Sequence, residues 1–177
     1  MATTEVILPD LQSCVLCEDV RHEFNGMQTL VGVINIVPAP QLPITCMRLC
    51  IWSRWCSGAG KFKQRSRIIG VDEQQVLAQA EVEFELKEME GHATNVHYFG
   101  GVQFQQFGLH HVEIYLEDEL RLRFPLPVVR VVAGADGIVG AERRELPCLP
   151  QVPTYPAAGL DQPAEGAVRV GRAGVDQ

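Results

Sequence analysis

The sequence predicts an all-β fold, an antiparallel β-sandwich of about eight strands. Three observations lead to this prediction. Short runs of apolar and β-branched residues alternate with polar ones, Gly, Pro, Asn and Asp separate the runs, and no segment repeats apolar residues at the spacing of a helix. Sheets without helices bury an apolar face only against another sheet or by closing on themselves, which indicates a sandwich or a barrel.

The strands are placed by these runs and by the turn residues between them. An Asn25-Gly26 pair favours a tight hairpin between the first two strands, and Pro38, Pro40 and Pro43 interrupt the ladder between the second and the third. In chain order, strands are expected over residues 14–18, 28–37, 44–55, 62–70, 76–86, 95–104, 109–117 and 120–132.

Alternating charges predict how the fourth and fifth strands pair. Cations occupy odd positions of the fourth strand and acids occupy odd positions of the fifth, so each row lies on one face of its strand. A turn centred near Glu73 gives the cross-strand pairs Lys61–Glu85, Lys63–Glu83 and Arg65–Glu81. The even positions then face the core.

The last two strands are predicted to form a hairpin on similar grounds. A loop formed by Glu117-Asp118-Glu119 would place Leu116 opposite Leu120 and Ile114 opposite Leu122. It would also set Glu113 opposite Arg123 on the solvent face.

Composition divides the chain into three parts. Residues 134–177 contain seven of the 16 Gly and five of the 11 Pro, and such a segment buries too little apolar area to offset its ordering entropy. We therefore predict an N-terminal extension over 1–11, a sandwich domain over 12–132 and a flexible Gly/Pro-rich tail over 133–177.

The second and third strands carry more apolar residues than one buried face requires. Strands that are apolar on both faces lie centrally or in an interface, so either the tail covers the second face or a partner does. This surplus predicts an interaction surface for a protein partner or for self-association. Its candidate residues are Val31, Val33, Met47, Leu49, Ile51, Trp52 and Trp55.

A metal site is a first alternative. Cys14 and Cys17 have a C-x2-C spacing, and Cys46 and Cys50 have a C-x3-C spacing. Residues three apart on a strand face opposite sides, so Cys14 and Cys17 would not converge on one ion, and small buried hydrophobes are the simpler interpretation. The five histidines include the adjacent pair His110-His111 but no His-x-His pattern, and a surface or loop-edge position is expected for them.

Binding of single-stranded nucleic acid is a second alternative. Residues 24–71 contain no Asp or Glu, and Trp52, Arg54 and Trp55 would combine base stacking with phosphate contacts. The acids that follow in the chain are expected to neutralise these cations, and the net charge of −7 opposes binding to polyanions.

Catalytic motifs are not found. Cys56-Ser57-Gly58 is no nucleophile elbow, and Gly60-Lys61 is followed by Phe62 rather than by the Ser or Thr of a phosphate-binding loop. The N-terminus lacks the pattern of a signal peptide, and no apolar run is long enough to span a membrane. We expect a non-enzymatic cytoplasmic protein with free thiols and without a cofactor.

Two parts of the sequence resemble a known family. The segment Leu16-Cys17-Glu18-Asp19-Val20-Arg21 is followed by Asn25-Gly26 and Leu30-Val31-Gly32-Val33, and Phe107-Gly108 leads into Val112-Glu113-Ile114-Tyr115. Together they resemble a bacterial family of uncharacterised small proteins, a domain of unknown function, over about residues 14–130. The resemblance implies one β-sandwich domain, immunoglobulin-like or C2-like in layout, and it implies no activity and no functional residue.

Overall fold

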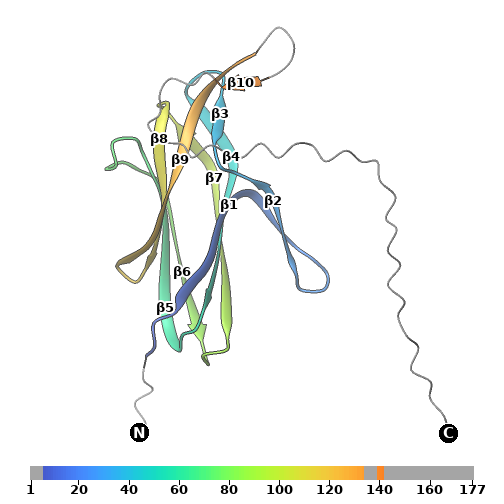
Figure 1. The fold of residues 1–177 in the computed structure, drawn as a ribbon, viewed down its shortest axis with the longest axis vertical. Coiled ribbons are helices and arrows are strands. Elements are labelled where there is room, and N and C mark those ends of the chain that lie inside the picture. Colours follow the sequence, from blue (N-terminus) through green and yellow to red (C-terminus); the bar gives the residue numbers. More distant parts are fainter. Residues whose placement is uncertain (1–5, 134–138, 142–177) are drawn as a thin grey trace, which may run out of the picture. The chain divides into compact units, whose positions relative to one another are not determined.

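A computed structural model describes residues 6–133 and 139–141 of the chain (Figure 1). All of the regular structure in these residues is β. The strands are β1 (Asp10–His22), β2 (Gln28–Val33), β3 (Val37–Ala39), β4 (Ile44–Cys56), β5 (Gly60–Ile69), β6 (Val76–Leu86), β7 (His92–Phe104), β8 (Gly108–Leu116), β9 (Glu119–Ala133) and β10 (Val139–Ala141).

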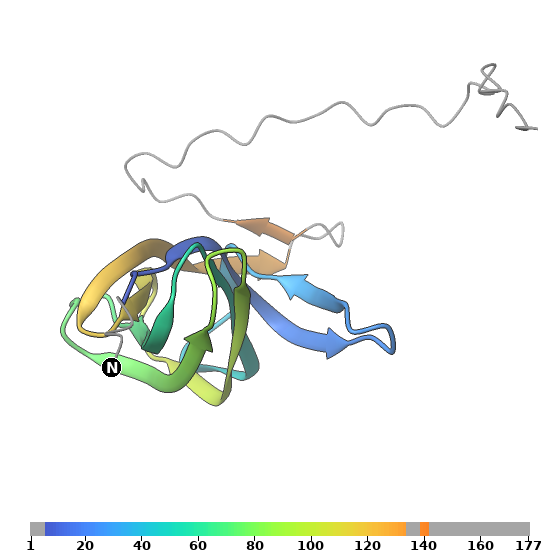
Figure 2. The same cartoon turned by 90° about the horizontal axis from the view of Figure 1, so that it is seen from below.

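The strands form the two sheets of a β-sandwich. One sheet has the order β2-β1-β4-β7, and the other has the order β10-β9-β8-β5-β6, with β3 pairing to β9. Strands β1-β4-β7 and β9-β8-β5-β6 follow the A-B-E and G-F-C-C′ orders of immunoglobulin-like sandwiches. The predicted all-β sandwich is confirmed, and this order corresponds to the immunoglobulin-like layout. In Figures 1 and 2 the hairpin of β1 and β2, in blue, projects from the side of the sandwich.

The predicted second strand, 28–37, is too long. β2 ends at Val33, next to Gly32, whose φ of +63° is a left-handed conformation that favours glycine. The chain then starts the short strand β3, in which Pro38 lies opposite Val129 in a parallel pair with β9. The prolines were expected to interrupt pairing, but a proline is tolerated in a short edge strand.

The β structure extends beyond both predicted boundaries of the sandwich domain. Residues 10–11, expected in the N-terminal extension, belong to β1, and Ile7 exchanges two backbone hydrogen bonds of 2.9 Å with Ala59. β10 pairs with β9 within the region assigned to the tail. The rest of the predicted flexible tail, 134–138 and 142–177, lies outside the described residues.

The predicted register of β5 and β6 is confirmed. Lys61 lies opposite Glu85, Lys63 opposite Glu83 and Arg65 opposite Glu81. The ion pairs themselves are partly diagonal, because the ammonium group of Lys63 pairs with Glu81 rather than with Glu83. The alternation of charges therefore predicts which residues lie opposite each other. It does not predict which of the neighbouring carboxylates a long side chain contacts.

The predicted last hairpin is correct in its inner part and wrong at its end. Glu113 lies opposite Arg123 and Ile114 opposite Leu122, as expected. A register shift between Ile114 and Tyr115 then places Leu116 opposite Glu119 rather than Leu120. The turn is shorter than predicted, and Glu117 adopts a positive φ of 53° within it.

The interior combines an apolar cluster with a polar centre. The apolar cluster draws on both sheets and includes Leu49, Phe104 and Ile114. Gln64 of β5 is completely buried, and its Oε1 accepts hydrogen bonds from Ser53 Oγ (2.9 Å), Trp55 Nε1 (2.6 Å) and Asn95 Nδ2 (2.9 Å). Its Nε2 donates to Ser66 Oγ at 3.0 Å. The polar centre therefore ties β4 and β7 of one sheet to β5 of the other.

His97 is also inside the sandwich, which contradicts the expected surface position. It is 5% exposed and lies edge-on to Phe99, with ring centroids 6.4 Å apart. Neither ring nitrogen has a hydrogen-bond partner among the described residues. Burial lowers the pKa of His97 below the ordinary value of a histidine because the charged imidazolium loses its hydration.

This burial predicts loss of stability in mild acid. As pH falls through about 6.5 the unfolded chain binds the proton of His97 before the folded chain does, so the free energy of unfolding decreases until pH drops below the folded pKa. Thermal unfolding measured between about pH 7 and pH 5 is expected to show a falling midpoint that is flatter in His97→Leu. His92→Gln, at an exposed histidine, serves as the control. Equal slopes in wild type and His97→Leu would contradict the prediction.

Candidate interaction surface

Three of the seven predicted surface residues lie in the core. Leu49, Ile51 and Trp55 are 1%, 0% and 0% exposed, because they occupy the face of β4 that packs against the second sheet. They cannot contact a partner on the folded protein, so their assignment to an interaction surface is wrong. Their alternation with polar positions on β4 identifies a core face, but a sequence that is apolar on both faces does not say which one.

The opposite face of β4 is covered by the chain itself. Cys17, Val20 and Cys50 form a second, smaller buried cluster, against which Leu30 and Trp52 pack. The indole Nε1–H of Trp52 donates to Gln28 Oε1 at 2.6 Å. The base of the β1–β2 hairpin therefore buries much of the apolar surplus that the sequence assigned to the tail or to a partner.

The remaining candidates, Val31, Val33 and Met47, lie where the first sheet divides. β1 pairs with β4 from Asp10 to Cys17 and with β2 from Cys17 to His22. β4 pairs with β7 along its whole length from Ile44, so residues 44–49 have no strand on their other edge within the described part of the chain. We call this gap, between residues 18–22 of β1 and 44–49 of β4, the β1–β4 split.

The split forms a depression with an apolar lining and a charged rim. Its volume is about 470 Å³. The apolar lining includes Val31, Ile34 and Met47, and the charged rim consists of Glu18, Asp19, Arg21 and Arg48. Arg48 Nη1 lies 3.0 Å from Asp19 Oδ2, so one ion pair crosses the split. Two acids and two bases give the rim no net charge.

Apolar side chains are exposed beside this depression. Met47, which lines it, is 77% exposed, and Val33, which precedes the lining residue Ile34 in the chain, is 57% exposed. Met47 lies where β4 faces Gly100 and Gly101 of β7, which carry no side chains to cover it. Gly101 has a φ of +69°, a left-handed conformation that favours glycine. The local sequence of β7 therefore leaves Met47 uncovered.

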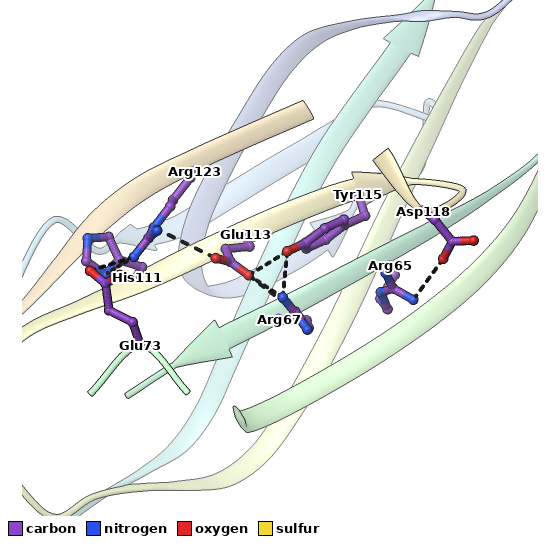
Figure 3. A network of polar contacts seen from close by, with 8 residues as sticks. All are labelled: Arg65, Arg67, Glu73, His111, Glu113, Tyr115, Asp118 and Arg123. Atoms are coloured by element: carbon purple, nitrogen blue, oxygen red, sulfur yellow. Dashed lines mark hydrogen bonds and ion pairs between the residues drawn. The ribbon is translucent and has the colours of Figure 1, made fainter. Parts of the chain in front are cut away.

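A cluster of charged residues around Glu113 lies on the outer face of the sheet that contains β5, β8 and β9 (Figure 3). Glu113 of β8 is 6% exposed, and its Oε2 accepts hydrogen bonds from Arg67 Nη2 at 2.7 Å and from the Tyr115 hydroxyl at 3.0 Å. Arg123 approaches the other carboxylate oxygen at 3.8 Å and binds Glu73 at 2.9 Å. The sequence indicated the Glu113–Arg123 pair but missed Arg67, because Arg67 reaches Glu113 through the pairing of β5 with β8, which are distant in sequence.

The Glu113 site is suited to holding the sheet together. The guanidinium groups of Arg65 and Arg67 lie 4.7 and 4.6 Å from the ring centre of Tyr115, as cation–π contacts. The carboxylate, the hydroxyl and the Arg67 guanidinium thus engage one another (Figure 3). A group that performs acid–base catalysis needs room for a substrate, and this arrangement fills the space with its own partners.

The cysteines divide between the two faces of the first sheet. Cys14 and Cys46 pack against the main core, whereas Cys17 and Cys50 lie in the second cluster. The expectation that Cys14 and Cys17 face opposite sides is confirmed. Among the residues that the structure describes, no group of three or more His, Cys, Asp or Glu side chains could hold a metal ion. Burial raises the pKa of the Cys14 thiol to about 12 and also raises that of Cys46, with a smaller effect from Glu18.

The predicted stacking surface for nucleic acid does not form. Trp55 is buried and bonded to Gln64, and Trp52 is half-buried against the β1–β2 hairpin. Arg54 therefore has no exposed tryptophan pair beside it.

His110, expected at the surface, is 2% exposed and lies edge-on to Phe104.

A protein-family model matches most of the chain. A family model described as a family of unknown function, DUF6941, matches residues 12–129. No curated protein matches the chain. In the described part of the chain, no helix is long and apolar enough to cross a membrane.

Proposed function

The chain belongs to the DUF6941 family of unknown function, and from that premise we propose that it is a non-enzymatic module that binds a protein partner at the β1–β4 split. The observation that carries the proposal is the exposure of Met47 and Val33 beside a depression of about 470 Å³. Exposed apolar residues that gather around a depression with a polar rim are typical of protein-binding sites.

The geometry of the split favours an extended partner segment. Within the described residues, 44–49 present an unpaired strand edge, and such an edge can accept a further strand through main-chain hydrogen bonds. Alternate side chains of the added segment would contact Val31, Ile34 and Met47 in the lining. The Arg48–Asp19 ion pair would open to admit it, and each charge could then pair with an opposite charge on the segment.

Self-association is the second form of the same proposal. A copy of the chain offers exposed apolar residues at the tip of its own β1–β2 hairpin, where Phe24 is fully exposed and Met27 is 63% exposed. Light scattering coupled to size exclusion distinguishes a dimer from a monomer. A dimer that dissociates on Met47→Asp would assign the split to self-association, whereas an unaffected dimer would place the contact elsewhere.

A binding experiment tests the module directly. Random peptides displayed on phage are selected on the wild-type chain, and the enriched peptides are measured by fluorescence anisotropy. We expect extended sequences with alternating apolar residues, and we expect Met47→Asp to weaken their binding about tenfold or more because it places a charge in the apolar contact.

The matched control is another exposed methionine. Met89 is 42% exposed in the turn between β6 and β7, away from the residues that line the split, so Met89→Asp should leave peptide binding unchanged. Failure to enrich peptides, or equal effects of the two substitutions, would contradict the proposed site.

A further inference from the structure

Cys17 and Cys50 face each other at the closed end of the β1–β4 split. They are direct partners in the antiparallel pairing of β1 with β4, and they form the last such pair before the two strands part. Directly opposed residues of antiparallel strands have Cα atoms roughly 4.5 or 5.5 Å apart, and both separations lie within the range that a disulfide spans, about 4.4–6.8 Å.

The two sulfur atoms point between the strands. Cys17 Sγ lies 3.7 Å from the carbonyl oxygen of Cys50, and Cys50 Sγ lies 3.4 Å from the carbonyl oxygen of Glu18. Each sulfur atom thus rests against the main chain of the strand that carries the other cysteine. Both residues are completely buried in the second cluster, together with Val20.

The local environment keeps this pair reduced while the fold is closed. Burial is the largest cause that raises the pKa of Cys17, and it raises that of Cys50 to about 11, to which the charge of Cys17 also contributes. Few thiolates therefore exist at neutral pH, and an oxidant cannot reach them. Access requires the β2 side of the hairpin, with Leu30, to move away from the cluster while β1 keeps Cys17 opposite Cys50.

We propose that Cys17 and Cys50 form a dithiol that is reversibly oxidised to a cross-strand disulfide when the hairpin opens. The oxidant is a small-molecule disulfide. One cysteine thiolate attacks it, forming a mixed disulfide and releasing one thiol, and the second cysteine thiolate then displaces the other thiol. Two protons leave the cysteines and appear on the two released thiols, and the two cysteine sulfurs are oxidised while the reagent is reduced. This proposal does not depend on peptide binding at the split.

Peptide mapping of the full-length chain tests the proposal. The folded protein is incubated with glutathione disulfide, free thiols are alkylated, and the tryptic peptides are identified by mass. Cleavage after Arg21, Arg48 and Arg54 places Cys50 in peptide 49–54, separate from Cys46, and places Cys14 and Cys17 together in peptide 1–21. We expect these two peptides to be joined, with loss of two hydrogens.

Variants assign the bond within peptide 1–21. The cross-link should persist in Cys14→Ala and in Cys46→Ala, and it should disappear in Cys17→Ala. If Cys17→Ala does not fold, the digest of Cys14→Ala still decides, because Cys17 is then the only cysteine left in its peptide.

The rate of oxidation tests the need for opening. Urea below the unfolding transition should accelerate formation of the cross-link, because it favours local separation of the hairpin. Glutathione adducts without a cross-link, a bond that joins other cysteines, or a cross-link that appears only in the unfolded chain would each overturn the proposal.

Discussion

Replacing Gln64 with alanine is expected to lower the free energy of unfolding by about 3–5 kcal/mol, one of the two largest effects in the domain. Gln64 Oε1 accepts three hydrogen bonds, and its removal leaves the donors of Trp55 and Asn95 unpaired in the interior, while the Ser53 hydroxyl keeps only its 3.4 Å bond to the carbonyl oxygen of Asn95. A cavity in the packed core adds to this cost. Unfolding in urea followed by tryptophan fluorescence measures the change.

A matched substitution shows whether the loss of stability in Gln64→Ala comes from its hydrogen bonds or would follow the removal of any glutamine. Gln79 lies on the neighbouring strand β6 and is exposed, so Gln79→Ala should change the free energy of unfolding by less than about 0.5 kcal/mol. Similar losses in the two variants would show that the hydrogen bonds to Gln64 contribute little.

Replacing Glu113 with alanine is expected to cost about 2–4 kcal/mol, because removing one partner leaves a charged group partly buried without its counter-ion. The side chain of Glu113 is 9% exposed and that of Arg67 is 26% exposed, so water screens this pair less than it screens a surface pair. Arg67 and Arg123 would then repel each other across the vacated position. Thermal unfolding measures the loss.

A double-mutant cycle identifies the source of that loss. Combining Glu113→Ala with Arg67→Ala should cost less than the sum of the single changes, with a coupling of about 1 kcal/mol or more. Glu119→Ala is the control, because Glu119 pairs with Arg121 but is 66% exposed, and a change within about 0.5 kcal/mol is expected. Additive effects of Glu113 and Arg67 would contradict a coupled pair.

The sequence predicted the parts of the fold that depend on neighbouring strands. Alternation placed Lys61, Lys63 and Arg65 opposite the correct acids, because a period of two fixes both the face and the register of a hairpin. The bulge after Ile114 was not predicted, since one extra residue leaves the alternation on either side intact. The pairing of β3 with β9 joins distant segments, and nothing in either segment specifies its partner.

The interaction surface was harder to predict than the fold. Val33 and Met47 are exposed as expected, whereas Leu49, Ile51 and Trp55 are in the core. A strand that is apolar on both faces indicates that both faces are covered. It does not indicate whether a hairpin of the same chain or a partner covers the outer face. The sequence did hold a signal for Gln64, because it is a polar residue at an even position of a strand whose even positions were predicted to face the core.

The ion pair across the split has a consequence for solubility. An open strand edge can template the growth of a sheet from one molecule to the next, and natural sheets often prevent this by placing charges at such an edge. Arg48 and Asp19 place a positive and a negative charge at the edge of β4 where residues 44–49 have no neighbouring strand among residues 6–133 and 139–141. An added strand without matching charges would leave both charges without a partner and partly dehydrated, so we expect this pair to disfavour unspecific growth of the sheet between molecules while still admitting a segment of complementary charge.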